Sequence, residues 1–255
     1  MVKSEEKFTG IANLYKNFRP SYPKELIDYL YSQVGFLDSS IIADVGSGTG
    51  MFSHLLIERG SSVYCVEPND DMRKTAESDL VGAGLKNFYS INASAENLKL
   101  QEKSIDFVTV AQAFHWFDRI LFKSECRRVL RNNGAAVLAW NFWDYSAKII
   151  KEQYIIREKY CVGTQGLMTR DMQKSDVRNF FLDEIYEKRR VKNDLFLNRE
   201  SFIGLYLTGS HSPREKKNPE KYYGLIKELN MHFDQHNIGG TIHLPQFTEC
   251  YIGMV

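Results

Sequence analysis

The sequence predicts an α/β protein with a doubly wound, mostly parallel sheet of seven strands and a helical cap. Three observations carry this prediction. Short apolar runs alternate with stretches of helical periodicity between residues 41 and 140. A glycine-rich loop, residues 44–50, follows the first apolar run, and Glu67 ends the second. Because the apolar runs are nearly continuous, helices should cover both faces of the sheet.

The individual elements follow from the same patterns. Residues 5–17 have a helical pattern that ends before Pro20, since a proline disfavours helical geometry in the residue before it. A second helix starts at Pro23. The first five expected strands are 41–45, 63–67, 88–91, 106–110 and 135–140. The helices between them are 51–59, one from Asp70 or Asp71 to Glu77, and one that Asp118 caps and that runs to Arg131, closed by Asn133 and Gly134.

The regular alternation stops after Trp140. Residues 145–183 and 199–236 have mainly helical patterns, 187–197 is a candidate sixth strand, and 239–255 is β-like. We expect a single domain over 1–255. Its core would be about 37–140 plus the C-terminal strands, and its cap would come from 1–36 and about 141–238.

Composition excludes several classes of protein. The formal net charge of +1 and pI of about 7.7 provide no field for nucleic acid or an anionic membrane. The four cysteines stand far apart, without the spacing of a disulfide framework or zinc knuckle. No apolar stretch has the length of a membrane span, and residues 1–7 lack the apolar segment of a signal peptide. We expect a cytoplasmic protein without nucleic-acid or membrane partners; the oligomeric state stays open.

The strongest chemical signal is the loop from Asp44 to Gly50 together with Glu67. Glycines let a ligand approach the backbone, and the next helix directs free N–H groups at it. A carboxylate such as Glu67 at the end of the next strand is placed to bind ribose hydroxyls, although it can also only cap the following helix. The G-x-G-x-G spacing differs from the G-x-G-x-x-G of dinucleotide enzymes. Asp44 suits an ammonium group better than a pyrophosphate, which favours S-adenosylmethionine as cofactor; a nicotinamide-dependent oxidoreductase is the alternative.

These motifs, in this order, resemble the class I S-adenosylmethionine-dependent methyltransferases. Within that class the sequence is similar to the type-11 group that includes trans-aconitate methyltransferase. The resemblance covers residues 8–140 and implies a Rossmann-like fold. It rests on the segments 15–23 (YKNFRPSYP), 44–50 (DVGSGTG), 66–72 (VEPNDDM), 92–98 (NASAENL) and 111–117 (AQAFHWF).

The resemblance also implies roles for individual residues toward the cofactor. The loop residues would shape the methionyl site, and further residues would bind the ribose, the adenine and the carboxylate. The residues concerned are Asp44, Gly46, Gly48 and Gly50 for the methionyl site, Glu67 for the ribose, Met72, Ser94 and Ala95 for the adenine, Gln112 and Ala113 for the methionyl side, and Tyr15 and Arg19 for the carboxylate. Many relatives have Asp where Ser94 stands, so this contact would be weaker here.

His115 and Trp116 follow the fourth strand and are expected on the acceptor side. His115 would be the catalytic residue, if any; it can act as a base or only position the acceptor, because methyl transfer needs alignment more than proton transfer. The aromatic residues just past the fifth strand, Trp140, Phe142, Trp143 and Tyr145, are acceptor walls or core. The expected acceptor is a small molecule, with carboxylates one class among several. A non-catalytic module that binds the cofactor stays a further alternative.

His232 and His236 have the i, i+4 spacing of metal ligands on a helix. The H-E-x-x-H pattern is absent and the sequence offers no third ligand beside them. We therefore expect no metal site.

Overall fold

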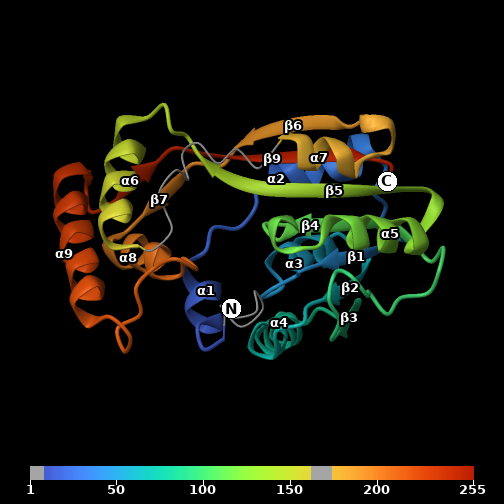
Figure 1. Cartoon of the computed structure of the whole chain (residues 1–255), viewed down its shortest axis with the longest axis horizontal. Helices are drawn as coiled ribbons and strands as arrows, with labels where there is room; N and C mark the ends of the chain where they lie inside the picture. Colours follow the sequence, from blue (N-terminus) through green and yellow to red (C-terminus); the bar gives the residue numbers. More distant parts are fainter. Residues whose placement is uncertain (1–8, 162–173) are drawn as a thin grey trace.

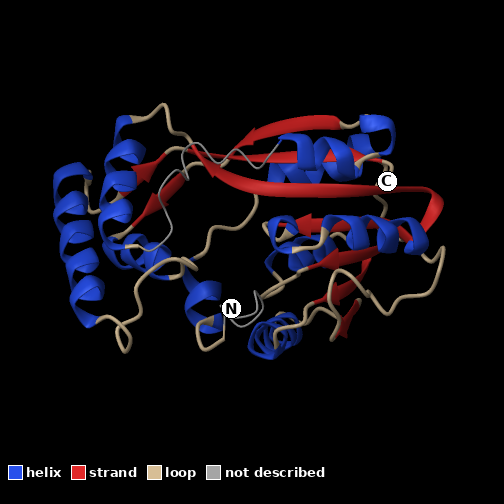
Figure 2. Ribbon diagram, in the orientation of Figure 1, coloured by secondary structure: helices blue, strands red, loops and turns tan. Residues whose placement is uncertain are grey.

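The computed structural model describes residues 9–161 and 174–255. Seven strands form one sheet in the order β3-β2-β1-β4-β5-β9-β6. The first five strands in this order are parallel, and β9 runs antiparallel to both of its neighbours. The predicted doubly wound, mostly parallel sheet is therefore confirmed, with one antiparallel strand near its edge (Figure 2). The strands are β1 Ile41–Val45, β2 Ser62–Val66, β3 Phe88–Ile91, β4 Ile105–Ala111, β5 Leu130–Trp143, β6 Glu187–Lys192 and β9 Gln246–Gly253.

Alternation along each strand separates the two faces of this sheet. Ile42 and Val137 pack with the residues of α2, α3 and α4. Their neighbours Ala43 and Ala136 pack on the other face with α5 and α7. Helices therefore cover both faces of the sheet, as the apolar runs predicted. The helices are α2 Lys24–Tyr29, continued by a π-helical turn Leu30–Val34, α3 Met51–Glu58, α4 Asp70–Gly82, α5 Arg119–Val129 and α7 Lys174–Phe180, with short 3₁₀ turns at Phe114–Trp116 and Leu182–Glu184.

A second cluster of helices lies at the other end of the molecule (Figure 1). Buried apolar residues of α6, α8, α9 and a small two-stranded sheet form a separate core there. We call these elements the cap. A Cβ at Gly204 of α8 would lie 2.4 Å from the Phe18 ring, so the absence of a side chain brings α1 against the cap. The cap consists of α6 Lys148–Tyr160, α8 Arg199–Leu207, α9 Pro219–His236, β7 Leu195–Leu197 and β8 Ile242–Leu244, and the helix that packs against it is α1 Ala12–Phe18.

Several expected boundaries are wrong. The helix expected to reach Arg131 ends at Val129, because the chain passes directly into β5 at Leu130. Gly134 lies within β5, where a Cβ would be 2.9 Å from the Asp106 carbonyl oxygen. The strand expected over 187–197 is two strands, β6 and β7, in different sheets. Both long helical stretches are interrupted. Of the elements expected in the cap, α2 and α7 pack on opposite faces of the sheet, and β6 is one of its strands.

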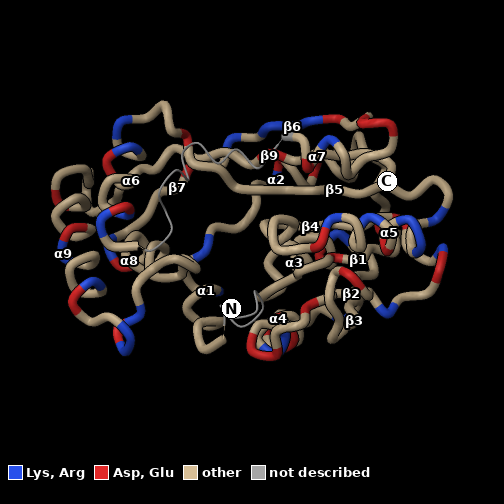
Figure 3. Tube along the Cα trace, in the orientation of Figure 1, with Lys and Arg blue, Asp and Glu red and all other residues tan. Residues whose placement is uncertain are grey.

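Two parts of the expected helices, residues 5–8 and 162–173, lie outside the described residues. Within the described ranges, no helix combines the length and apolar character needed to cross a bilayer. Acidic and basic residues alternate along the trace in Figure 3, in keeping with the near-zero net charge.

Candidate functional site

The glycine-rich loop is tied to the end of β2. The amides of Gly46 and Ser47 donate to the Val66 carbonyl at 2.8 and 3.2 Å. Gly46 has a φ of +68°, and a Cβ there would lie 2.5 Å from the Ala113 Cβ. Only glycine meets both conditions without strain. The loop backbone therefore approaches the end of β4 closely.

Glu67 orients the loop from the other side. Its side chain is 8% exposed, and its Oε2 accepts a hydrogen bond from the Gly48 amide at 2.9 Å. Its Oε1 accepts one from the Asn69 amide at 2.8 Å. The cap of α4 is instead Asn69, whose side chain accepts from the Met72 amide. Glu67 is therefore not the helix cap, and these two hydrogen bonds fix the orientation of its carboxylate.

A first hollow opens at the carboxyl ends of β1, β2 and β4. The predicted residues Met72, Ser94, Ala95 and Ala113 all lie along it, and so does Glu67. The lining residues are Tyr15, Gly46, Gly48, Glu67, Pro68, Met72, Ser94, Ala95, Glu96, Ala111, Gln112, Ala113, Trp116 and Phe117. It thus combines a carboxylate, backbone groups and apolar walls, the mixture that a nucleoside requires.

A second hollow adjoins the first and reaches the cap. The two hollows share Tyr15, Gly46, Gly48, Ala111 and Gln112. The further residues of the second hollow are Arg19, Pro20, Tyr22, Ser47, Thr49, Met51, Phe52, Asn141, Trp143, Leu205 and Gln246. One continuous site therefore runs from Glu67, past the glycine loop, to the underside of α8.

Three buried polar atoms of the second hollow lack hydrogen-bond partners. They are Nε of Arg19, Oγ of Ser47 and Oγ1 of Thr49, judged within the part of the chain that the structure describes. The Arg19 guanidinium lies 5.0 Å from the centre of the Tyr15 ring. Buried polar atoms left without partners are costly, so this group of atoms fits a polar ligand.

Gln112 forms the junction of the two hollows. Its φ of +62° is in the left-handed region, which costs a non-glycine residue energy that the surrounding structure must supply. Its amide donates to the Ala139 carbonyl at 2.9 Å, and its side-chain Nε2 donates to the Asn141 carbonyl at 3.2 Å. These bonds hold the chain in a turn that exposes the end of β4.

Two residues of the expected loop site do not line either hollow. Asp44 is fully buried, and its carboxylate accepts hydrogen bonds from Ser53 Oγ at 2.6 Å and Thr109 Oγ1 at 2.8 Å. Burial raises the pKa of Asp44 to about 6, opposed by these hydrogen bonds. A Cβ at Gly50 would lie 3.1 Å from the Ala76 Cβ, so Gly50 permits packing of α3 on α4. Both residues therefore support the loop without lining either hollow, and their part in shaping the methionyl site stays a prediction.

The rings of His115 and Trp116, in the turn after β4, are in contact, with centroids 4.8 Å apart. Trp116 lines the first hollow, as Glu67 does, and is absent from the described lining of the second hollow; its place on the acceptor side stays a prediction. His115 is exposed and is absent from the lining of both hollows as the described residues form them. A three-residue helical turn buries Phe114 in the core and carries His115 outward. The structure therefore does not support His115 as an acceptor-side residue.

Of the aromatic residues past Ala139, only Trp143 lines the second hollow. Trp140 is 3% exposed and packs on Phe114 and Tyr251 within the core. Phe142 contacts Phe247, and Tyr145 contacts Tyr154. Of these four residues Trp143 is therefore the one placed at the second hollow, and its role as an acceptor wall stays a prediction.

The sequence predicted no site role for several residues that line the second hollow, among them Tyr22, Leu205 and Gln246. Tyr22 belongs to the segment 15–23, one of the five segments of the family resemblance, but the resemblance implied roles there only for Tyr15 and Arg19. Burial raises its pKa well above the ordinary value, with Tyr15 and Asp44 adding to the effect and Arg19 opposing it, so it stays a neutral donor. Leu205 and Gln246 reach the site from more than 60 residues beyond β5, and no local pattern marks them.

The comparisons with known proteins agree with this geometry. The family model described as a methyltransferase domain matches residues 43–138. This similarity covers the core of the sheet and the loops at the carboxyl ends of its strands. The matched residues contain the glycine loop, Glu67, Gln112 and most of the first hollow.

Relatives extend the similarity somewhat further. An uncharacterized methyltransferase of Mycobacterium tuberculosis is 35% identical over 145 residues, 57% of this chain and 56% of the relative. A protein of Dictyostelium discoideum assigned as a methyltransferase is 33% identical over 169 residues, 65% of this chain and 60% of the relative. The chain therefore spans little more than half the length of these curated relatives.

Solved structures share the fold over most of the chain. A protein of Anaeromyxobacter dehalogenans assigned as a type II methyltransferase has a TM-score of 0.61 at 21% identity, covering 93% of this chain and 98% of that one. The YcgJ protein of Bacillus subtilis has a TM-score of 0.54 at 15% identity, covering 91% and 100%. These similarities support the Rossmann-like fold, including the cap region, but not a particular acceptor.

Proposed function

We propose that the protein is an S-adenosylmethionine-dependent methyltransferase that acts on a small molecule bound in the second hollow. The observation that carries the proposal is the continuity of the two hollows at Gln112. The first hollow has the Glu67 carboxylate and apolar walls. The second hollow has the unpartnered atoms of Arg19, Ser47 and Thr49. These features match the diol, the base and the amino-acid group of this cofactor.

S-adenosylmethionine supplies, when bound, an electrophilic methyl group on a sulfonium centre. Glu67 would accept hydrogen bonds from the ribose, and Met72 would lie against the adenine. Arg19 would pair with the carboxylate, since a guanidinium forms strong charge-assisted hydrogen bonds with it. The chain's further contribution is to align the acceptor and to exclude water, which suffices for much of the rate of such a transfer.

Several walls of the second hollow suit an acceptor of modest size. Trp143 and Tyr22 offer aromatic surface, Asn141 and Gln246 offer amides, and Leu205 closes the hollow from the cap. Arg214 lies behind Arg19: burial lowers its pKa, and the Arg19 charge lowers it further. Arg19 would pair with the carboxylate of the cofactor, and the second positive charge, on Arg214, favours a further anion nearby, so carboxylates are the acceptor class to screen first.

Turnover with a labelled methyl donor tests this proposal. We expect the protein to release S-adenosylhomocysteine and a labelled product when fractions of a metabolite extract are supplied, with carboxylates among the active fractions. The Glu67→Ala variant is the control for cofactor-dependent turnover. Tight binding of S-adenosylmethionine without turnover in any fraction would instead indicate a non-catalytic module. Thermal stabilisation by a nicotinamide cofactor, and not by S-adenosylmethionine, would indicate the oxidoreductase.

A further inference from the structure

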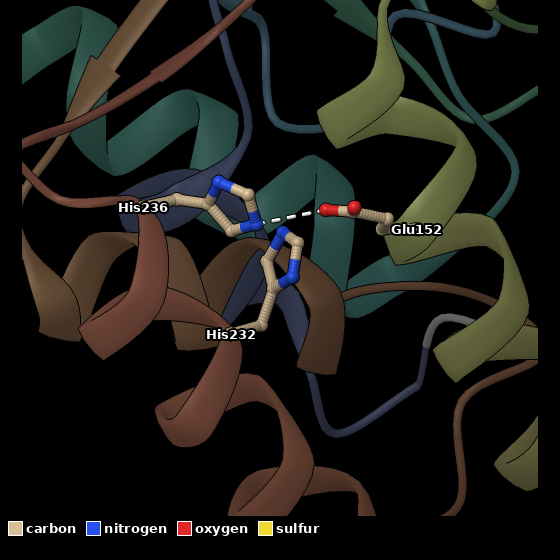
Figure 4. Close-up of side chains that lie close together, drawn as sticks. All are labelled: Glu152, His232 and His236. Atoms are coloured by element: carbon tan, nitrogen blue, oxygen red, sulfur yellow. Dashed lines mark ion pairs between the residues drawn. The ribbon is translucent and has the colours of Figure 1, made fainter.

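A group of metal-ligand side chains lies in the cap. His232 and His236 are one turn apart on α9, and Glu152 faces them from α6. One nitrogen or oxygen atom from each residue lies within 4.8 Å of those of the other two. Figure 4 shows the three side chains converging between the two helices. The third ligand, which the sequence does not reveal, thus comes from a helix about 80 residues away.

Two polar atoms in this group are buried without a hydrogen-bond partner among the described residues. His232 is 4% exposed, and its Nε2 has no hydrogen-bond partner among the described residues. Oε2 of Glu152 is buried and accepts no hydrogen bond of good geometry, although it lies 2.8 Å from Nε2 of His236. Unsatisfied polar atoms in a buried position are uncommon and need a physical explanation. A cation between the three side chains would provide one.

We propose that Glu152, His232 and His236 bind one divalent transition-metal ion, for which Zn²⁺ is the best match. Two imidazoles and one carboxylate form a set of ligands that Zn²⁺ accepts, with water in the fourth position. The side chains of Glu152 and His236 are 32% and 28% exposed, so the ion and a water molecule can enter from solvent. A surface hollow that adjoins Glu152 and His232 provides the route.

Binding requires only small movements of side chains. Tetrahedral Zn²⁺ with bonds of 2.0–2.2 Å separates its ligand atoms by about 3.4 Å. The His236–Glu152 contact, at 2.8 Å, would open slightly, and the other two pairs, whose atoms lie within 4.8 Å, would adjust to the same separation. Because His236 and Glu152 are partly exposed, their side chains can make this adjustment while His232, which packs near Phe202, stays in place.

The ion would link α6 to α9 and stabilise the cap. Buried residues of both helices, such as Ile150 and Leu229, share one apolar cluster with Leu205, which lines the second hollow. None of the three ligands lines either hollow of the candidate active site. The proposed role is therefore structural and does not depend on the proposed methyl transfer.

Zinc titration of chelator-treated full-length protein tests the site. We expect one Zn²⁺ per chain by calorimetry and a rise in Tm, since a ligand that binds only the folded state stabilises it. His236→Ala and Glu152→Gln should each weaken binding at least tenfold and abolish most of the Tm rise. His243→Ala is the matched control: His243 also lies in the cap and pairs with a carboxylate, Asp194, at 2.7 Å, but is outside the group. It should bind Zn²⁺ like the wild type.

X-ray absorption of the zinc-loaded protein provides a second measurement. Two imidazole ligands and one or more oxygens at 2.0–2.2 Å are expected in the wild type, and one imidazole in His236→Ala. Absence of stoichiometric binding, or equal binding by the wild type and both ligand variants, would overturn the proposal. In that case His236 and Glu152 form an ion pair only. If His236→Ala does not fold, as judged by circular dichroism, Glu152→Gln, which preserves side-chain volume, decides the matter.

Discussion

Oε2 of Glu67 accepts a hydrogen bond from the Gly48 amide at 2.9 Å, which joins the end of β2 to the glycine loop that follows β1. The two motifs that predicted a nucleotide site are thus in direct contact. Because the Asn69 amide fixes the other carboxylate oxygen at 2.8 Å, the side chain is oriented before any ligand arrives. Preorganisation of this kind lowers the entropy that binding costs.

The first prediction concerns Glu67. Replacing it with alanine should weaken binding of S-adenosylmethionine and S-adenosylhomocysteine by about 1.5–3 kcal/mol, the range for hydrogen bonds to a charged partner. Calorimetric titration measures the loss. Glu58→Ala, at the end of α3 and outside both hollows, is the control. Unchanged affinity in Glu67→Ala would exclude Glu67 as the ribose ligand.

Arg19 provides the second prediction. Arg19→Ala should weaken binding of intact S-adenosylmethionine by about 1.5–3 kcal/mol, but should affect an analogue without the carboxylate much less. The motivation is the unpartnered Nε of Arg19 in the second hollow. Arg59→Ala is a matched control, since Arg59 also lies over a tyrosine ring, at 4.6 Å from the centre of Tyr31. Equal losses for both ligands would show that Arg19 does not recognise the carboxylate.

The sequence predicted those features that depend on neighbours along the chain. The glycine loop, Glu67 and the residues near Ser94 follow strands whose carboxyl ends meet at one edge of a parallel sheet, so their proximity follows from fold class alone. The alternation within β1 also indicates which way Asp44 faces. Asp44 shares a face with Ile42, which packs under α3, and this placed its carboxylate toward Ser53.

Other features depend on tertiary packing and had no local signal. Nothing in residues 111–117 indicates that a 3₁₀ turn would send His115 outward and Trp116 into the hollow. The contribution of Leu205 depends on how α8 packs on α1 at Gly204. Glu152 meets the histidines of α9 only because α6 and α9 pack together in the cap.

Asp44 leads to a prediction about pH. Its pKa of about 6 in the folded protein exceeds the value near 3.9 expected in the unfolded chain. The folded state therefore binds more protons between pH 4 and 6, so this group makes stability fall as pH rises through that window. Asp44→Asn should remove this fall and increase stability at pH 7 by roughly 1–3 kcal/mol, because one pKa unit corresponds to about 1.4 kcal/mol. Denaturant unfolding between pH 4 and 8 measures it.

The same substitution should weaken cofactor binding, since Asp44 is a negative charge behind a site for a cationic ligand. Opposite effects on stability and affinity distinguish a charge kept for function from a purely structural one. Asp28→Asn, a half-exposed carboxylate paired with Arg59, is the control and should change neither property appreciably. A less stable Asp44→Asn protein with unchanged pH dependence would contradict this account of Asp44.

The last prediction separates Trp116 from His115. Trp116 lines the first hollow, so Trp116→Ala should reduce cofactor affinity by about 1–3 kcal/mol, the range for loss of an aromatic wall against a base. His115 is exposed and outside the described lining of both hollows, so His115→Ala should leave affinity and turnover within about threefold of wild type. Titration and steady-state kinetics of both variants test this. A general base contributes roughly 10²–10⁴-fold, so a loss of that size in His115→Ala with intact cofactor binding would instead establish His115 as the catalytic residue.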